Sequence, residues 1–131
     1  MTLPQLKNKL QKLTNEYVRK RDSQNGYAKC ISCGKIMKVG TFHAGHYYPA
    51  GKYENLRFDT DNIHAQCVKC NYYEHGNQIE YRKNLIKKIG QERVDRLDLK
   101  AGYYKKYGHK WSRFTLEQMI LEMKQKLKEW D

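Results

Sequence analysis

The chain has 131 residues, of which 39% are hydrophobic, and its formal net charge is +12. This length suits a single domain with a modest apolar core, so cross-links would add useful stability. No apolar leader and no bilayer-spanning apolar run is present in the sequence, so we expect a cytoplasmic protein without a membrane role. In a reducing compartment, the four cysteines favour a metal over disulfides.

The positive charge is concentrated in the two ends of the chain. Residues 1–29 carry seven Lys and Arg against two acids, residues 30–77 five against four, and residues 78–131 fourteen against eight. We therefore divide the single domain, 1–131, into a basic N-terminal helical arm, a nearly neutral core and a basic helical C-terminal part. Basic flanks favour a polyanion such as duplex DNA. The alternative is a basic protein that its charge merely keeps soluble.

Helical patterns occur in both flanks. Apolar residues at three- and four-residue steps predict a helix to about residue 22, with Thr2 as N-cap. Capping-box patterns at Asn77 and Thr115 predict two more helices, the first ended by Gly90. We expect the apolar face over residues 116–130 to contact the core, including the N-terminal helix. The leucine seam of that helix could instead join two copies of the chain.

Two cysteine pairs with equal spacing predict a metal site. Cys30 and Cys33, like Cys67 and Cys70, have two residues between them, so a tight turn can aim both thiolates at one tetrahedral ion. Gly34 suits the bend after the first pair. Four thiolates close the shell of Zn²⁺, which indicates a structural ion with no catalytic role. The 33 residues between the pairs exceed the about 15 to 20 of a plain zinc ribbon, so this insert should display something.

The polar residues of the insert resemble a known nuclease superfamily. The order His46-x-x-Pro49, then Asn62, then Asn71 directly after the second cysteine pair resembles the HNH nucleases. The stretches "EYVRKRDSQNGYAKCISCG", "AGHY", "LRFDTDNIHAQCVKCN" and "YRKNLIKKIGQERVDRL" more narrowly resemble the NinG (Rap) recombination nucleases of lambdoid phages. The resemblance runs over residues 16–97.

The resemblance implies a fold and an activity. The fold would be α+β, with a zinc-stapled ββα-metal (HNH, treble-clef-like) core and flanking α-helices. The activity would be metal-dependent, structure-specific DNA endonuclease action on branched recombination intermediates such as Holliday junctions and D-loops, in an infected or lysogenic bacterial host. Host recombination proteins would be partners, and a homodimer would supply the two active sites that symmetric cutting requires. The alternative is a zinc-stapled DNA-binding or architectural module without chemistry.

The resemblance also implies roles for single residues. His46 would be the general base and Asn62 would orient its imidazole. Asn71 and His75 stand four positions apart, so on a helix they would share a face and could hold a divalent cation, Mg²⁺ or Mn²⁺. Each of these residues has a structural alternative, because asparagine is also common in turns and at helix N-caps.

One position departs from the HNH pattern. The residue before the base is commonly a metal ligand, and here it is Gly45. His43 could take its place if the strand bends at this glycine. A set of one asparagine and two histidines would also suit Mn²⁺, Ni²⁺ or Zn²⁺. We interpret His64 as structural and His109 as a surface residue.

The stretch Lys100–Phe114 combines five basic residues and no acid with several aromatic side chains. This mixture can pair with phosphates and stack on exposed bases. The predicted DNA contacts are Lys100, Lys105, Lys106, Lys110, Arg113, Tyr104 and Trp111. Two glycines argue against one continuous helix here. The competing interpretation places the aromatic rings in the core and only the lysines in water.

Overall fold

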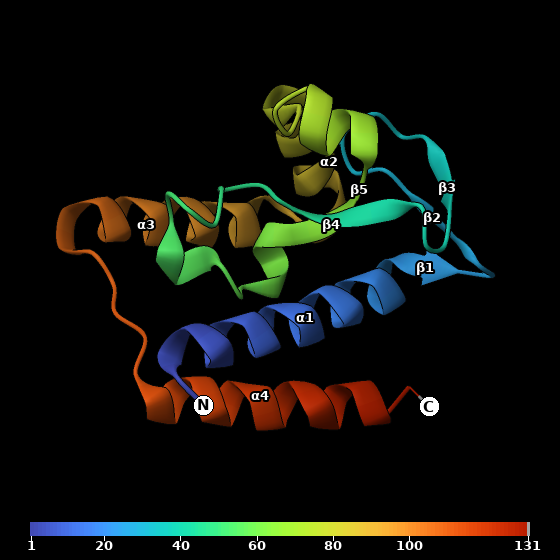
Figure 1. Cartoon of the computed structure of the whole chain (residues 1–131). Helices are drawn as coiled ribbons and strands as arrows, with labels where there is room; N and C mark the ends of the chain where they lie inside the picture. The colour runs from blue at the N-terminus through green and yellow to red at the C-terminus, as the bar shows by residue number, and fades with distance from the viewer. Residues whose placement is uncertain (131) are drawn as a thin grey trace.

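The structure, a computed structural model, describes residues 1–130 (Figure 1). Helices and short strands both occur, which confirms the expected α+β class. In chain order the elements are α1 (Leu3–Asp22), β1 (Ser23–Gln24), β2 (Tyr27–Lys29), β3 (Ile36–Lys38), β4 (Phe42–His46), η1 (Glu54–Leu56), η2 (Thr60–Asn62), β5 (Ile63–Cys67), η3 (Lys69–Tyr73), α2 (Gln78–Ile89), α3 (Gln91–Tyr107) and α4 (Arg113–Lys128).

Helices α1 and α4 lie side by side and run in the same direction (Figure 1). Thr2 caps α1 in a capping box with Gln5, as its position predicts. Tyr17 stacks on Trp130 with ring centroids 4.8 Å apart. The buried cluster between the helices contains Leu6, Leu10, Phe58, Leu116, Ile120, Met123 and Leu127. The predicted contact is confirmed, and the leucine seam of α1 therefore packs within the chain.

Two helix starts differ from the sequence patterns, and one helix end agrees with them. α4 begins at Arg113, because Ser112 rather than Thr115 is its N-cap and accepts a hydrogen bond from the Thr115 N–H at 3.1 Å. The capping box at Asn77 is wrong: this residue has φ 43° and makes no side-chain cap. Gly90 ends α2 as predicted, with φ 92°, and α3 follows at once.

The structure contains two small antiparallel sheets: the β4-β5 pair lies between α1 and the helices α2 and α3, and the three-stranded sheet lies beyond the end of α1 (Figure 1). One has the order β1-β2-β3, and the other is the pair β4-β5, in which His46 lies opposite Ile63. All five residues of β5 are buried, as expected for a strand covered on both faces. On one face Tyr81 of α2 donates a hydrogen bond to the Gly45 carbonyl at 2.7 Å, and α1 contacts the pair as well.

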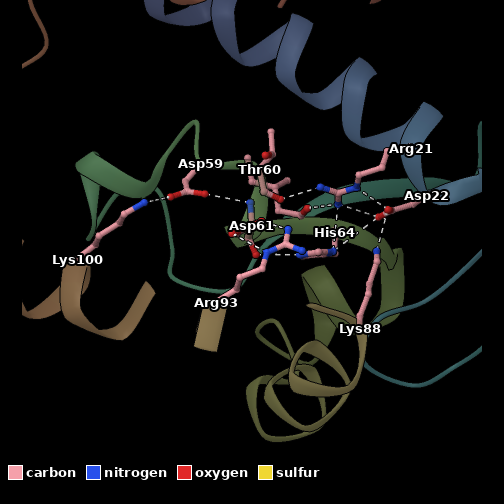
Figure 2. Close-up of polar contacts among 10 residues, drawn as sticks. Arg21, Asp22, Asp59, Thr60, Asp61, His64, Lys88, Arg93 and Lys100 are labelled. Atoms are coloured by element: carbon pink, nitrogen blue, oxygen red, sulfur yellow. Dashed lines mark hydrogen bonds and ion pairs between the residues drawn. The ribbon is translucent and has the colours of Figure 1, made fainter. Parts of the chain in front are cut away.

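A buried charge network ties α1 to this pair of strands and to α2 (Figure 2). The Asp22 carboxylate accepts hydrogen bonds from the Ala65 N–H and from Arg21, and it forms an ion pair with Lys88, each at 2.8 Å. Burial alone would raise the pKa of Asp22, but the two cations outweigh it and hold that pKa at about 2. The carboxylate therefore stays ionised at neutral pH.

His64 lies inside the same network (Figure 2). Its Nε2 donates to the Asp61 carbonyl at 2.9 Å, so its Nδ1 can accept from Arg21 at 3.1 Å. Burial, with the charges of Lys88 and Arg21, lowers the pKa of His64 to about 3. This histidine is neutral and buried, which confirms its structural interpretation.

No helix within residues 1–130 is both long and apolar enough to cross a membrane.

Candidate metal centre and active site

The two cysteine pairs converge on one point. Cys30 and Cys33 lie in the turn after β2, Cys67 ends β5, and Cys70 lies in η3. All four sulfur atoms lie within 4.8 Å of one another. Gly34 adopts φ 79°, a conformation that glycine permits, and its N–H donates to the Cys30 carbonyl at 3.0 Å. The local turns thus bring together residues that the sequence separates widely.

Hydrogen bonds to sulfur surround this cluster. Backbone N–H groups of Cys67 and Cys33 approach the Cys30 sulfur at 3.3 and 3.5 Å, and the Cys70 N–H approaches the Cys67 sulfur at 3.4 Å. The side-chain amide of Asn77, which does not cap α2, donates a hydrogen bond to the Cys70 sulfur at 3.5 Å. Such donors favour the thiolate form, and four cysteines that form no disulfide fit a tetrahedral ion such as Zn²⁺. Among residues 1–130, no other cluster of three or more His, Cys, Asp or Glu forms a comparable metal site.

His46, the predicted base, ends β4 with its ring fixed in one orientation. Its Nε2 lies 2.8 Å from the Arg57 carbonyl oxygen. Because a carbonyl only accepts, Nε2 carries the hydrogen in the neutral ring and Nδ1 is left as an acceptor. Burial lowers the pKa of His46 below its usual 6.5. The hydrogen bond to the Arg57 carbonyl opposes this lowering, and the positive charge of Arg57 adds to it. The imidazole is therefore neutral at pH 7.

A shallow depression of about 440 Å³ adjoins this imidazole. Helix α1, strand β4 and the loop that follows β4 all contribute to it. Its lining residues are Gln11, Asn15, Ala44, His46, Ala50, Gly51, Glu54 and Arg57. A base beside an open polar depression has room for water and for a polyanionic substrate.

Asn62 acts on the loop and makes no hydrogen bond to His46 within the described chain. Its buried side chain accepts from the Tyr48 N–H at 2.9 Å and donates to the carbonyls of Tyr48 and Leu56 at 3.0 and 3.2 Å. These bonds hold both ends of the loop whose Arg57 carbonyl binds His46. Asn62 can therefore orient His46 only indirectly, by holding the backbone of the loop that carries the Arg57 carbonyl.

The predicted cation ligands are only partly brought together. His43 Nδ1 lies 2.8 Å from the Asn71 side-chain amide nitrogen. The expected helical face shared by Asn71 and His75 is wrong, because η3 ends at Tyr73 and His75 lies in an exposed turn with φ 48°. A turn with positive φ redirects the chain before the next helix begins.

β4 does not bend at Gly45. The strand stays in regular register with β5 from Phe42 to His46, so alternation puts the side chains of His43 and His46 on opposite faces, about 10 Å apart along the strand. A Cβ atom at Gly45 would lie 2.1 Å from Gln66 Oε1. Gly45 stands where the HNH pattern commonly has a metal ligand, and the side chain of Gln66 occupies the space that a side chain at this position would need.

The predicted DNA-binding stretch divides into buried rings and exposed charges. Trp111 packs on Phe58 and donates to the Glu54 carbonyl at 3.2 Å, and half-buried Tyr104 lies over Tyr53. The core interpretation is therefore correct for these two rings, whereas the aromatic residues that face water here are Tyr103, Tyr107 and Phe114.

The basic side chains of this stretch are exposed, and some have partners. Lys100 forms an ion pair with Asp59 at 2.9 Å (Figure 2). Arg113 lies 3.5 Å from Glu117. Lys105 and Lys106 lie over tyrosine rings, and Lys110 is exposed. Exposed side chains of this kind can exchange such contacts for a phosphate at little cost.

The fold and the cysteine cluster define a small α+β protein with four cysteines placed so that they could hold a metal ion. The chain belongs to the NinG family, whose description is "Bacteriophage Lambda NinG protein" and which matches residues 2–131. It is 37% identical to "Protein ninG" of Escherichia phage lambda over 119 residues, 91% of this chain and 54% of that protein. "Protein ninG" of Escherichia phage 933W is also 37% identical over 119 residues, 91% of this chain and 55% of the relative.

"Protein ninG" of Enterobacteria phage H19B is 38% identical over 108 residues, 82% of this chain and 48% of its own length. The chain thus spans about half the length of the curated relatives it matches. No solved protein structure is significantly similar to it.

Proposed function

We propose that this chain is a metal-dependent, structure-specific DNA endonuclease of the HNH type, acting on branched recombination intermediates such as Holliday junctions and D-loops. The observation that carries the proposal is the state of His46: its Nε2 is bound to the Arg57 carbonyl, its ring is neutral, and it adjoins an open depression. The order β4, loop, β5 and η3 agrees with the ββα arrangement that the sequence resemblance implies.

In this proposal His46 acts as the general base of phosphodiester hydrolysis. Nδ1 takes a proton from a water molecule as the water oxygen bonds to phosphorus and a bridging P–O bond breaks. The leaving oxygen receives a proton from solvent, and His46 returns its proton to solvent. Positioned base catalysis of this kind contributes about 10² to 10⁴ in rate.

The catalytic cation would be held by His43 and Asn71. Their nitrogen atoms are already 2.8 Å apart, and exchange of the Asn71 amide oxygen and nitrogen would present an imidazole nitrogen and a carbonyl oxygen together. Two protein ligands fit Mg²⁺ or Mn²⁺, which keep several waters and bind substrate phosphates. This pair lies on the face of β4 opposite to His46, about 10 Å away along the strand, so a cation bound there would neutralise DNA phosphates beside the one that is attacked. The cysteine centre would hold structural Zn²⁺ and take no part in the reaction.

DNA would be bound through the exposed basic residues of α3 and of the segment before α4. The charge of +12 and the free aromatic rings beside these residues support duplex arms with exposed bases at a branch as the substrate. A homodimer and host recombination proteins remain proposed partners, in the cytoplasm of the phage host.

A plasmid-nicking assay tests this function. With Mg²⁺ or Mn²⁺, supercoiled plasmid or a four-way junction should be cut, and EDTA should abolish cutting. One equivalent of Zn²⁺ added after EDTA has been removed by dialysis should restore the fold without restoring cleavage, which separates the two metals. Tight DNA binding without any cutting across the metal series would instead favour the non-catalytic DNA-binding module.

A further inference from the structure

The depression beside His46 has a cation of its own. The His43–Asn71 pair belongs to the opposite face of β4, about 10 Å away along the strand. Among the residues that line the depression, Arg57 is the one positively charged side chain. A phosphodiester placed for attack by water at His46 would therefore meet Arg57.

The Arg57 guanidinium is held in place by α1 and by its own neighbour. Its Nε donates to Gln11 Oε1 at 3.1 Å, and the Gln11 amide donates to Asn15 Oδ1 at 2.8 Å. The guanidinium carbon lies 5.2 Å from the centroid of the Phe58 ring. One edge and one face of the cation are thus fixed, as binding of an oxyanion in a defined geometry requires.

The other edge of this guanidinium is available. Its two terminal nitrogen atoms make no hydrogen bond within residues 1–130, and the nearest carboxylate oxygen, Glu54 Oε1, lies 3.8 Å from Nη1. That oxygen is only 3.0 Å from Lys7 Nζ, so Lys7 already neutralises it. The side chain of Arg57 is 22% exposed, which leaves a desolvated but reachable cation.

We propose that Arg57 is a catalytic residue that binds a non-bridging oxygen of the scissile phosphate, with Gln11 and Asn15 of α1 as its positioning residues. The proposal rests on the proposed endonuclease function and adds the phosphate subsite to it. Arg57 then acts twice: its carbonyl fixes the tautomer of His46, and its guanidinium fixes the phosphate that the activated water attacks. The N-terminal helix becomes part of the active site.

The test compares Arg57→Ala and Arg57→Lys in single-turnover cleavage of a labelled four-way junction, with gel-shift affinity in Ca²⁺ over a salt series. Both variants keep the backbone carbonyl that binds His46. Arg57→Ala should cut about 10² to 10³ times more slowly, and free guanidinium should partly restore the rate. Arg57→Lys should lose less, because it keeps the charge and loses only the planar fork. The salt slope of Arg57→Ala should fall by about one unit.

Two comparisons separate this role from a structural one. Gln11→Met removes the acceptor at similar volume and should slow cleavage about tenfold at unchanged melting temperature. Arg96→Ala is the matched control, since Arg96 is exposed, pairs with Glu92 and does not line the depression. It should cut like the wild type.

The outcomes distinguish this inference from the proposed function. If the wild type cuts and Arg57→Ala or a folded Arg57→Lys cuts equally fast, the phosphate subsite is wrong and the endonuclease stands. If the wild type never cuts but Arg57→Ala still lowers the salt slope, a phosphate contact exists without the endonuclease. An unchanged slope in a protein that does not cut would overturn both.

Discussion

At the scale of single residues, two histidines near the same strand pair illustrate what decides a role. Burial is the leading cause of the lowered pKa of both His46 and His64. His64 is bonded at both ring nitrogens inside the protein, whereas His46 is bonded at one and adjoins the depression. Their place in the hairpin, and not their residue type, makes one a candidate base and the other a structural group.

His64 should make the protein sensitive to acid well above the range in which carboxylates titrate. Its pKa is about 3 in the folded chain, against a usual 6.5, so the unfolded state binds a proton that the folded state refuses. Its contribution to stability is complete above pH 6.5 and is lost as the pH falls toward 3, by about 1.4 kcal/mol per pH unit.

Denaturant unfolding between pH 7 and pH 4.5 should show this slope, and His64→Gln should flatten it. His109→Gln, at an exposed histidine, serves as the control and should leave the slope intact. Equal slopes for the wild type and His64→Gln would contradict the buried neutral histidine.

At the scale of elements, the sequence was informative wherever short-range chemistry decides structure. Thr2, Gly90 and the two cysteine pairs act within a few residues, and each lies as the pattern predicted. The patterns failed where a distant partner decided. Asn77 bonds to the Cys70 sulfur and so does not cap α2, and the turn after η3 sends His75 away from Asn71.

Removal of one thiolate should unfold the core. Cys67 ends β5 and its backbone also bonds the Cys30 sulfur, so Cys67→Ser weakens both the metal site and the strand that carries it. Zinc binding in comparable sites supplies about 10 to 16 kcal/mol, more than the stability of most small domains. Circular dichroism and zinc content should therefore fall together.

Asn71→Ala is the control for this change, because Asn71 follows Cys70 directly but contacts His43 and no sulfur. It should retain zinc and fold. A folded Cys67→Ser protein with full activity and no zinc would rule out a structural ion.

The end of α3 should carry phosphate contacts. Changing Lys105, Lys106 and Lys110 to Ala should weaken junction binding and flatten its salt dependence by up to about three units of slope if each meets one phosphate. A triple change of Lys124, Lys126 and Lys128 in α4 removes the same charge and should alter the slope less. Equal effects would mean a diffuse charge attraction, and no effect from the first set would place the DNA elsewhere.

At the scale of the whole molecule, α1 connects the parts. Its apolar side packs on α4, its end joins the network of Asp22, and its polar side contributes Gln11 and Asn15 to the depression at His46. A helical pattern predicts the apolar side alone. It cannot tell which polar residues approach a site over thirty positions away, and for the same reason it could not assign Trp111 to the core.

The central claim is that His46 is the base of a phosphodiester-cleaving site, and His46→Ala tests it most directly. The decisive measurement is single-turnover cleavage of a labelled four-way junction across a Mg²⁺ and Mn²⁺ series, with gel-shift affinity in Ca²⁺ as the binding control. Cleavage should fall by about 10² to 10⁴ at every metal concentration, while zinc content and affinity stay unchanged. His43→Ala should instead require more metal and be partly rescued by Mn²⁺. Cleavage by His46→Ala at the wild-type rate would contradict the account.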